Sequence, residues 1–330
     1  MLRRDFTAWA MLAGLGLAGV APGRAALAQA APWPQRPVRV LVGFAPGGFA
    51  DIVARAMAEQ MTATLGQTFV VENRTGASGT LATAAAVRAP ADGSVLLLGH
   101  STPNAVAAAL FKDLPYDPVQ DLTPIAQVAV HPHMLVVPAN SPFGSTAELV
   151  AAAKARPGSV TYASAGIGSV HHLASAMFAQ KAGLELTHVP YRGSAPAMAD
   201  LLAGRVSMAI DGVSAVAPQI ADGRLRPLAA GTLARIGRFP DLPTLQEQGY
   251  GDIDAMSWVG LFGPAGLPPE VVATAAAAID QALKAPPVLK MLADASTIAA
   301  TRRGPEFGTF VAAEVDRYKA VLGDNRIPLE

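Results

Sequence analysis

Two glycine-rich segments carry the residue types best suited to hold an anion. The first is Phe44-Ala-Pro-Gly-Gly-Phe-Ala-Asp51, and the second is Tyr162-Ala-Ser-Ala-Gly-Ile-Gly-Ser169. Each lies between a strand-like pattern and a helix-like pattern. Glycine lets backbone N–H groups turn toward a bound anion, and the N-terminus of a helix adds partial positive charge. One such segment is weak evidence, but a matched pair predicts an anionic ligand held from two sides.

Neither segment is a nucleotide-binding motif. The Walker spacing with its lysine is missing, and the second segment lacks the third glycine and the downstream acid of a dinucleotide fingerprint. Asp51 falls in the first helical turn after the first segment, where a carboxylate caps free N–H groups and favours the helix dipole. We therefore expect Asp51 to hold the loop in shape, so that its role in ligand binding is indirect.

The histidines raise the question of a metal site. His131 and His133 are two apart in a strand-like segment, and His171 and His172 are adjacent at the start of a helix. Zinc usually takes three or four ligands, and no comparable spacing is present. Adjacent side chains on a helix point about 100° apart, so both cannot easily bind one ion. We predict no metal site and keep His172 as a hydrogen-bond donor to the ligand.

Nothing in the residues requires catalysis. A nucleophile needs a base oriented on it, and no G-x-S-x-G motif is present. Ser169 followed by His171 and His172 is too local to define a triad. Cysteine is absent, which excludes thiolate nucleophiles, disulfides and cysteine-ligated metals. We therefore predict no catalytic residue.

Strand and helix patterns alternate along the chain that must position these segments. We expect strands at residues 38–44, 68–71, 95–98, 134–137, 161–164, 186–189, 206–211 and 258–262. We expect helices at residues 53–65, 77–87, 146–155, 170–182, 195–202, 269–283 and 305–322. Such alternation indicates right-handed βαβ units with parallel strands. The sequence therefore predicts two α/β units and a mainly helical C-terminal region.

The composition limits the class of protein. Of the 330 residues, 51% are hydrophobic and 15% are charged, which excludes a disordered chain. Lys and Arg number 25, and Asp and Glu also number 25, so no basic surface draws the protein to nucleic acid or anionic lipid. We expect no nucleic-acid partner and no cofactor.

Residues 1–30 have the pattern of an export signal. Arg3 and Arg4 precede an uncharged stretch from Ala8 to Ala21, and A-x-A cleavage motifs end at Ala28 and Ala30. The stretch is too short to span a bilayer. We expect cleavage near Ala28 or Ala30 and a periplasmic protein, exported by the twin-arginine or the general secretory route. An N-terminal membrane anchor is the alternative.

Several motifs follow one another in order from about Pro34 to the C-terminus. They are F-A-P-G-G-x-x-D at 44–51, V-E-N-R-x-G-A-x-G at 71–79, A-D-G at 91–93, L-P-Y-D-P at 114–118, Y-A-S-x-G-x-G-S at 162–169, H-V-P-Y-R-G at 188–193, L-P-T at 242–244 and G-P-A-G at 263–266. With these motifs the chain resembles the Bug-type receptors, which are the periplasmic solute-binding proteins of tripartite tricarboxylate transporters.

The resemblance implies an α/β fold of the two-lobed, clamshell-like periplasmic-binding-protein kind, each lobe a mostly parallel sheet flanked by helices. Lobe one would take residues 32–131 and 254–330, and lobe two residues 132–253. A monomeric receptor would bind a small organic carboxylate in the cleft between the lobes and deliver it to the membrane subunits of the transporter. A hydrolase or isomerase acting on a small carboxylate, and a ligand sensor for a signalling partner, remain the alternatives.

The resemblance also implies that backbone amides of the two glycine loops and ordered water hold one carboxylate, without an obligatory arginine. Carried onto this sequence, the candidate ligand-binding residues are Phe44, Gly47, Gly48, Phe49, Asp51, Ala77, Ser78, Ser164, Gly166, Gly168, Ser169, His172, Tyr191, Arg192, Gly193 and Asp211. Gly48 and Gly168 are expected to need a conformation or a close approach that a Cβ forbids. Arg192 is either close to the ligand or a surface charge.

One departure from the family pattern bears on the ligand. The two positions after the double glycine are often small or hydroxylated, and here they are Phe49 and Ala50. A hydroxyl donor is lost, and we expect an aromatic ring in the pocket. This favours an apolar or aromatic carboxylate over a citrate-like or amino-acid ligand.

Overall fold

The computed structural model describes residues 32–111 and 113–325, and the predicted export signal with Arg3, Arg4, Ala28 and Ala30 lies outside them. The strands are β1 (Val38–Val42), β2 (Phe69–Asn73), β3 (Val95–His100), β4 (Leu122–Pro138), β5 (Thr161–Ser164), β6 (Thr187–Pro190), β7 (Met208–Gly212), β8 (Leu225–Ala230), β9 (Met256–Pro264) and β10 (Ile298–Ala299). The helices are α1 (Phe49–Leu65), α2 (Thr80–Val87), α3 (Ala107–Leu110), α4 (Thr146–Ala155), α5 (Val170–Ala182), α6 (Ser194–Leu202), α7 (Val213–Ala221), α8 (Pro269–Ala282), α9 (Pro286–Asp294) and α10 (Gly304–Asn325). A 3-10 turn, η1 (Ala77–Gly79), precedes α2, and a π-helical turn, η2 (Thr102–Val106), precedes α3.

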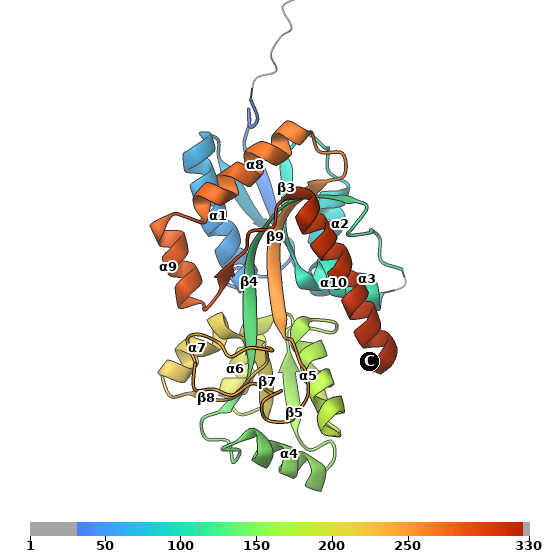
Figure 1. Ribbon diagram of the computed structural model, residues 1–330, viewed down its shortest axis with the longest axis vertical. Coiled ribbons are helices and arrows are strands. Elements are labelled where there is room, and N and C mark those ends of the chain that lie inside the picture. Colours follow the sequence, from blue (N-terminus) through green and yellow to red (C-terminus); the bar gives the residue numbers. More distant parts are fainter. Residues whose placement is uncertain (1–31, 112, 326–330) are drawn as a thin grey trace, which may run out of the picture. The chain divides into compact units, whose positions relative to one another are not determined.

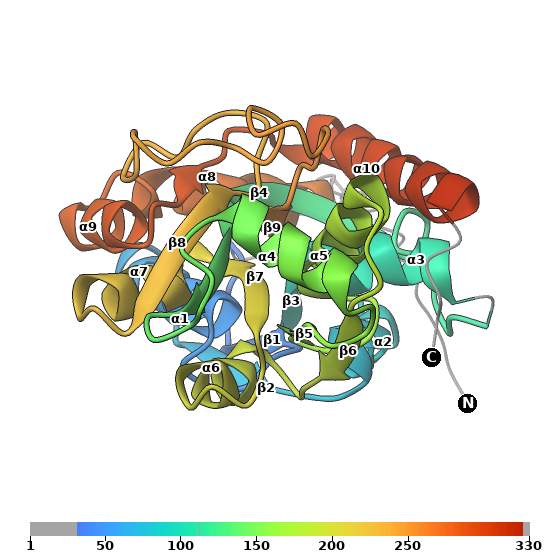
Figure 2. The same cartoon turned by 90° about the horizontal axis from the view of Figure 1, so that it is seen from below.

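Strands β1, β2, β3 and β9 form a first group with the N-terminal part of β4. Strand β1 is parallel to β2 and β3, whereas β9 is antiparallel to β3 and β4. Val38, Val40 and Val42 pack toward α1 and α8, while Leu41 and Leu97 pack toward α2 and α10. Since strand side chains alternate between faces, both faces of this part of the sheet are buried. Figures 1 and 2 show the helices on both sides of the strands.

A second group surrounds β7. Strand β5 is parallel to β6 and β7, and the C-terminal part of β4 is antiparallel to β7 and β8. Met134 and Val136 of β4 pack with residues of α6 and α7, whereas Leu135 and Val137 pack with residues of α4 and α5. Helices therefore cover both faces of this group as well.

Strand β4 belongs to both groups. Its residues 122–132 pair with β9, and from His133 onward it pairs with β7. Figure 1 shows β4 and β9 side by side along the middle of the molecule, reaching from the first group toward the second. His131, His133 and Ser257 therefore lie where the two groups meet.

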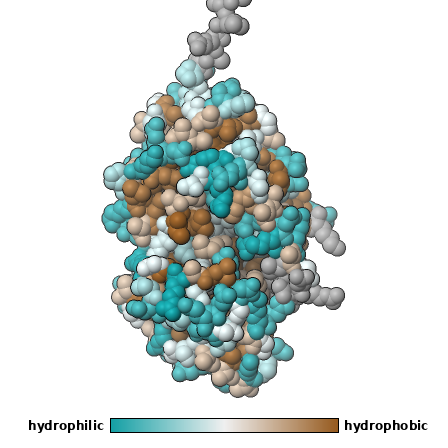
Figure 3. Space-filling model, in the orientation of Figure 1, coloured by the Kyte–Doolittle hydropathy of each residue, from teal (hydrophilic) through white to brown (hydrophobic). Residues whose placement is uncertain are grey.

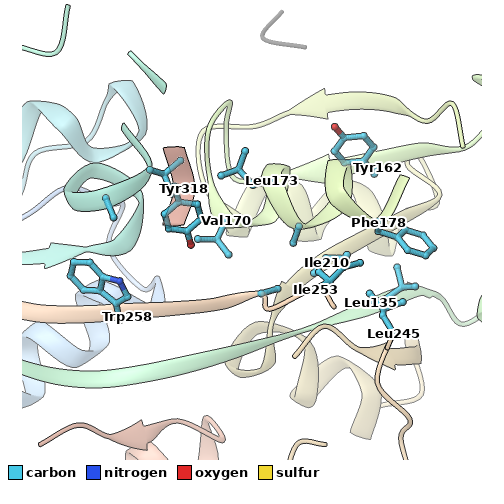
Figure 4. Packing of buried hydrophobic residues seen from close by; sticks show 14 of the residues in the cluster. Leu135, Tyr162, Val170, Leu173, Phe178, Ile210, Leu245, Ile253, Trp258 and Tyr318 are labelled. Atoms are coloured by element: carbon cyan, nitrogen blue, oxygen red, sulfur yellow. The ribbon is translucent and has the colours of Figure 1, made fainter. Parts of the chain in front are cut away.

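One cluster of buried apolar side chains contains residues of both groups. Figure 4 shows Tyr318 of α10 beside Val170 of α5, with Trp258 of β9 farther along the same cluster. On the face in Figure 3, hydrophilic and hydrophobic residues are interspersed. Among the described helices, none combines the length and the apolar character needed to cross a membrane.

Several predicted boundaries differ from the observed ones for local reasons. The helix expected from residue 77 begins at Thr80, because Ala77 and Ser78 have φ values of +45° and +54°, which a helix excludes. The strand expected at 134–137 is only the end of the 17-residue β4. Helices α7 and α9 were not predicted. Pro218 lies inside α7 and weakens its helical pattern, whereas α9 begins with its two prolines and is only nine residues long.

Candidate ligand-binding site

The first glycine loop joins β1 to α1 and is held by Asp51. The Asp51 side chain is buried and accepts a hydrogen bond from the Gly47 amide at 2.9 Å. Arg55 Nε donates to the same carboxylate at 3.0 Å, and Asn73 Nδ2 donates at 2.9 Å. Burial alone would raise the pKa of Asp51, but these donors outweigh burial and hold the pKa below its usual range. The carboxylate therefore holds the loop in shape, as expected from the sequence.

The two glycines of this loop differ in what they require. Gly47 has a φ of +79°, which favours glycine, and its amide is already taken by Asp51. Gly48 has a φ of −78°, and a Cβ there would lie 3.4 Å from Ala45 O, an ordinary contact. Neither the backbone conformation nor a contact with the described residues therefore requires glycine at position 48. No described residue accepts a hydrogen bond from the amides of Phe49 and Ala50, which begin α1.

Two phenylalanines flank the first loop, and each contacts a histidine. The Phe49 ring stacks on His131 of β4, with ring centroids 4.2 Å apart and an interplanar angle of 15°. The Phe44 ring lies 4.9 Å from the ring of His100, which ends β3. His131 therefore covers one face of the Phe49 ring, and the entry of this ring into the ligand pocket stays a prediction.

The second glycine loop joins β5 to α5 and is closed by its own hydrogen bonds. The Gly166 amide donates to Ser164 Oγ at 3.2 Å, and the Ser169 amide donates to Gly166 O at 3.1 Å. Ser169 is the N-cap of α5, and its Oγ accepts from the His172 amide at 3.2 Å. As in the first loop, the amides of the first two helical residues, Val170 and His171, have no acceptor among the described residues.

His172 supports the second loop from inside. The Gly168 amide donates to His172 Nδ1 at 3.1 Å, which leaves the proton of the neutral ring on Nε2. The ring stacks on His188 with centroids 4.1 Å apart, and burial, followed by the charge of His188, lowers the pKa of His172 to about 4. Nδ1 of His172 therefore accepts from its own loop, and a hydrogen bond from its Nε2–H to the ligand stays a prediction. Gly168 has a φ of +74°, and a Cβ there would collide with Leu110, so the expected need for glycine at 168 is confirmed.

Asp211 lies in a saturated hydrogen-bond network. Its carboxylate is buried and accepts from Ser194 Oγ at 2.7 Å, from the Gly212 amide at 2.7 Å and from His171 Nε2 at 2.9 Å. Burial alone would raise the pKa of Asp211, but the charge and hydrogen bond of His171, together with Ser194, lower it well below its usual range. Asp211 therefore orients His171, the histidine that sequence analysis did not select.

The two groups of strands touch at the predicted site through Ser78. Ser78 Oγ donates to Ile167 O at 2.9 Å. A Cβ on Gly166 would lie 3.2 Å from the same hydroxyl and 3.3 Å from Tyr191 O. The positive φ of Ala77 and Ser78 interrupts the helix at η1, and this turn contacts the second loop. The structure thus brings together residues after β2, β5 and β6.

The segment after β6 holds three of the predicted site residues, Tyr191, Arg192 and Gly193. Tyr191 Oη donates to Asp200 at 2.7 Å, and burial together with this carboxylate raises the pKa of Tyr191 to about 12. Arg192 is exposed, and no described residue forms an ion pair or hydrogen bond with it. Gly193 has a φ of +118° and is the N-cap of α6. Tyr191 therefore forms its hydrogen bond within its own group of strands, and a role of Arg192 close to the ligand stays a prediction.

Four histidines gather where the two groups meet, and sequence analysis selected none of them. They are His100, His131, His133 and His171. The ring of His133 lies 4.9 Å from the ring of His171 and 5.5 Å from that of His131. The polar run at 100–102 directly after a fully buried strand was the available signal for His100, because ligands bind at the carboxyl ends of parallel strands. Within the described ranges, no three His, Asp or Glu side chains are grouped as metal ligands.

A surface pocket of about 280 Å³ lies between the segment before β4 and α10. Its lining includes Tyr116, Asp117, Asp316 and Lys319, and none of the predicted site residues. The two carboxylates outnumber the one ammonium, so this pocket does not favour an anion. The candidate site therefore remains at the two glycine loops.

Known proteins share both the sequence and the fold. The sequence model of the family described as tripartite tricarboxylate transporter family receptor matches residues 53–326. Protein BugT of Bordetella pertussis is 35% identical over 321 residues, which are 97% of this chain and 98% of BugT. The solved structure titled R. palustris Rpa4515 with adipate has a TM-score of 0.85 at 33% identity, covering 89% of this chain and 99% of that one. MatC from Rhodopseudomonas palustris with bound malate has a TM-score of 0.82 at 32% identity, covering 88% and 99%.

Solved structures confirm the predicted α/β periplasmic-binding-protein fold. The expectation that each lobe has a mostly parallel sheet is wrong, because the long strands β4 and β9 run between the two groups and pair antiparallel with their neighbours. The chain belongs to the tripartite tricarboxylate transporter receptor family. This is a family of periplasmic solute-binding proteins that serve transport, and its members are binding proteins rather than enzymes. A receptor of this kind works with the other components of a transporter.

Proposed function

We propose that this protein captures a small organic carboxylate between its two glycine loops and delivers it to the membrane subunits of a tripartite transporter. One observation carries the proposal. The first amides of two helices have no acceptor among the described residues, and both helix N-termini lie where the two groups of strands meet. Phe49 of α1 stacks on His131, whose ring neighbours His133, which in turn neighbours His171 of α5. Only the rings of His131 and His133 lie between the first residue of α1 and the N-terminal turn of α5 in this chain of ring contacts.

Backbone amides supply the donors in this mechanism. Phe49 and Ala50 at the start of α1, and Val170 and His171 at the start of α5, have N–H groups without acceptors among the described residues. The N–H groups and the dipole of a helix N-terminus both favour an anion. Two helices with one carboxylate between them supply this interaction twice, so no arginine is needed.

The boundary between the two groups of strands is also the boundary between the proposed lobes. We assign residues 32–131 and 254–330 to one lobe and residues 132–253 to the other. The strand pairing supports this division, because β4 changes partner from β9 to β7 between residues 132 and 133. The rings of Phe44 and Phe49 beside the first loop favour a ligand with an apolar or aromatic body. The receptor acts as a monomer that closes its two lobes on the ligand.

Export precedes binding in this account. The signal at residues 1–30 is removed between about Ala26 and Ala31, and the mature protein works in the periplasm. N-terminal sequencing of periplasmic material is expected to begin within that interval. Material that begins at Met1 would contradict export with cleavage.

Native mass spectrometry of freshly purified mature protein tests the binding function. We expect a co-purified organic acid that is released on unfolding and recovered chemically unchanged after rebinding. A thermal-shift screen of carboxylates follows, because a ligand at about 100 times its Kd adds about 2.7 kcal/mol of stability. Gly168→Val is the variant expected to lose the shift, and Gly48→Ala is the matched control that keeps it. A bound acid that is converted to product would establish an enzyme instead.

A further inference from the structure

The turn between β2 and α2 has a strained backbone. Four consecutive residues have positive φ values, between +45° and +132°, and they are Gly76, Ala77, Ser78 and Gly79. Alanine and serine rarely adopt this region, and they remain in it only where the surrounding structure holds them. The Gly79 amide donates to Gly76 O at 2.9 Å, and Thr80 Oγ1 donates to Ala77 O at 2.9 Å. The turn is therefore fixed by its own hydrogen bonds.

The first group of strands holds the same turn from behind. A Cβ on Gly43, directly after β1, would lie 2.7 Å from Gly79 Cα, so the two backbones are in close contact. A Cβ on Gly79 would lie 3.2 Å from Pro103 Cγ and 3.3 Å from Phe44 Cε2. Because all of these neighbours belong to the first group, Ser78 is held in place as part of that group.

Ser78 crosses from this turn to the second glycine loop. Its Oγ donates to Ile167 O at 2.9 Å, which uses the one proton of the hydroxyl. The next amide along the chain, that of Gly168, donates to His172 Nδ1 at 3.1 Å. The peptide between Ile167 and Gly168 is therefore held at its oxygen by the first group and at its nitrogen by the second. The side chain of Leu110 in α3 adds an apolar contact, because it occupies the space into which a Cβ on Gly168 would project.

We propose that Ser78 is a positioning residue that clamps the second loop against the first group when the two lobes close. Its hydrogen bond joins residues 89 positions apart, on opposite lobes, so the bond must break when the lobes separate. The free amides of Val170 and His171 follow Ile167 by three and four residues. The clamp therefore holds these amides at a fixed distance from the first loop without touching the ligand. This inference rests on the proposed two-lobed receptor and adds a residue that controls its closure.

Distances between two spin labels test the clamp without a ligand. The chain has no cysteine, so labels attach only to cysteines that are introduced. Ala63 in the last turn of α1 and Ala151 of α4 are exposed and lie in opposite groups. In mature protein that carries Ala63→Cys and Ala151→Cys, double electron–electron resonance measures the fractions of closed and open molecules.

Two substitutions separate the hydroxyl of Ser78 from its backbone strain. Ser78→Ala removes the hydroxyl and keeps the Cβ, whereas Ser78→Gly removes both and is at ease with the positive φ. We expect the ratio of open to closed molecules to rise about fivefold in each, as for the loss of one typical hydrogen bond. Ser159→Ala is the matched control, because Ser159 Oγ donates to Arg156 O at 2.6 Å within the second group. It should leave the ratio unchanged.

Dissociation kinetics relate the clamp to binding. The probe is the tightest-binding of succinate, adipate, phthalate and benzoate, and we expect it to raise the closed fraction of wild type. Because the clamp acts in the closed complex, the dissociation rate of the probe should rise about fivefold in Ser78→Ala and in Ser78→Gly. Ser159→Ala should keep the wild-type rate. Stopped-flow displacement measures these rates.

The outcomes separate the clamp from the receptor function. Equal ratios of open to closed molecules in wild type and Ser78→Ala, or a ratio that rises in Ser78→Ala but not in Ser78→Gly, overturn the clamp and leave the receptor intact. Faster dissociation with unchanged label distances also overturns the clamp, because it places the hydroxyl on the ligand. If wild type binds none of the four acids while the label distances change as expected, the clamp stands and the proposed carboxylate receptor is contradicted.

Discussion

The two glycine loops offer the same backbone donors but are held in shape by different chemistry. In each, the amides of the first two helical residues have no acceptor among the described residues. Asp51 holds the first loop as a buried anion that accepts from Gly47, Arg55 and Asn73. His172 holds the second loop as a neutral ring that accepts from Gly168. One loop therefore depends on a charge, and the other depends on the absence of one.

The two loops also differ in why they need glycine. In the first loop the left-handed residue is Gly47, and an added Cβ there would meet no atom within 4 Å, so only the backbone conformation requires glycine. In the second loop Gly168 is left-handed and also packed against Leu110 of the opposite group. Substitution in the second loop therefore disturbs both its own conformation and the contact between the groups.

The largest expected effect is at Gly168. Gly168→Val combines an unfavourable φ with a collision against Leu110, so ligand affinity should fall by well over tenfold, about 1.4 kcal/mol or more. Gly48→Ala places its Cβ 3.4 Å from Ala45 O and should bind within about threefold of wild type. Calorimetry on the two variants, with circular dichroism to verify folding, makes the comparison. Equal losses at both positions would remove the distinction between the loops.

Acid should lower the free energy of unfolding, because several buried histidines are neutral in the folded protein. The pKa of His172 is lowered to about 4 in the folded state, against about 6.5 when unfolded, so its stabilising effect is complete above pH 6.5 and is lost as the pH falls toward 4. Between pH 6.5 and 5 this corresponds to about 2 kcal/mol for His172. Urea unfolding at pH 7 and pH 5 measures the loss.

A single substitution isolates the contribution of His172 to this pH dependence. His172→Asn keeps an acceptor near the Nδ1 position for the Gly168 amide but does not titrate. The unfolding free energy of this variant should fall less steeply as the pH is lowered. The difference in slope from wild type should correspond to close to one fewer proton taken up on unfolding. The buried His100 and His133, whose pKa values are each lowered to about 3, account for much of the remaining slope. An unchanged slope would show that His172 is not neutral in the folded protein.

A smaller effect is expected at Asp51. Asp51→Asn keeps an oxygen for the Gly47 amide but loses the charge that strengthens its hydrogen bonds, at a cost of about 1 kcal/mol in stability. Ligand affinity should fall less than in Gly168→Val, because the change acts only through the shape of the loop. Denaturant unfolding and calorimetry measure the two effects. A loss of affinity larger than that of Gly168→Val would indicate that Asp51 contacts the ligand directly.

The smallest effect is expected at Arg192. Its side chain is exposed and has no partner among the described residues, so Arg192→Gln should change affinity by less than about twofold. A desolvated ion pair with the ligand would instead lose about 2–5 kcal/mol on truncation. Titration of the variant at low and moderate salt separates the two cases. Abolished binding would replace the backbone mechanism with a salt bridge.

Local patterns in the sequence were sufficient to predict most strands and helices and the two loops, whereas the two-lobed fold came from the family resemblance. Apolar runs followed by glycines and then by a helical period mark Phe44–Asp51 and the loop at 164–169 without reference to any other part of the chain. The motifs added the order of the elements and hence the family. The capping role of Asp51 is likewise local, since its partner Gly47 is four residues away.

The choice between His171 and His172 could not be made from sequence. Adjacent helical residues point in different directions, and which one faces Asp211 depends on how α5 packs against β7. The same holds for Gly47 and Gly48, where only the backbone φ distinguishes the residue that needs glycine. Long-range packing, rather than residue type, decides these positions.

Amide chemical shifts test the central claim most directly. A two-dimensional ¹⁵N–¹H spectrum of mature protein, recorded with and without the tightest-binding acid from the screen, reports each backbone N–H separately. We expect downfield shifts of the proton resonances of Phe49 and Ala50 together with those of Val170 and His171, because both helix N-termini donate to one carboxylate. Shifts confined to one loop, or centred on Arg192 with these four amides unchanged, would contradict it.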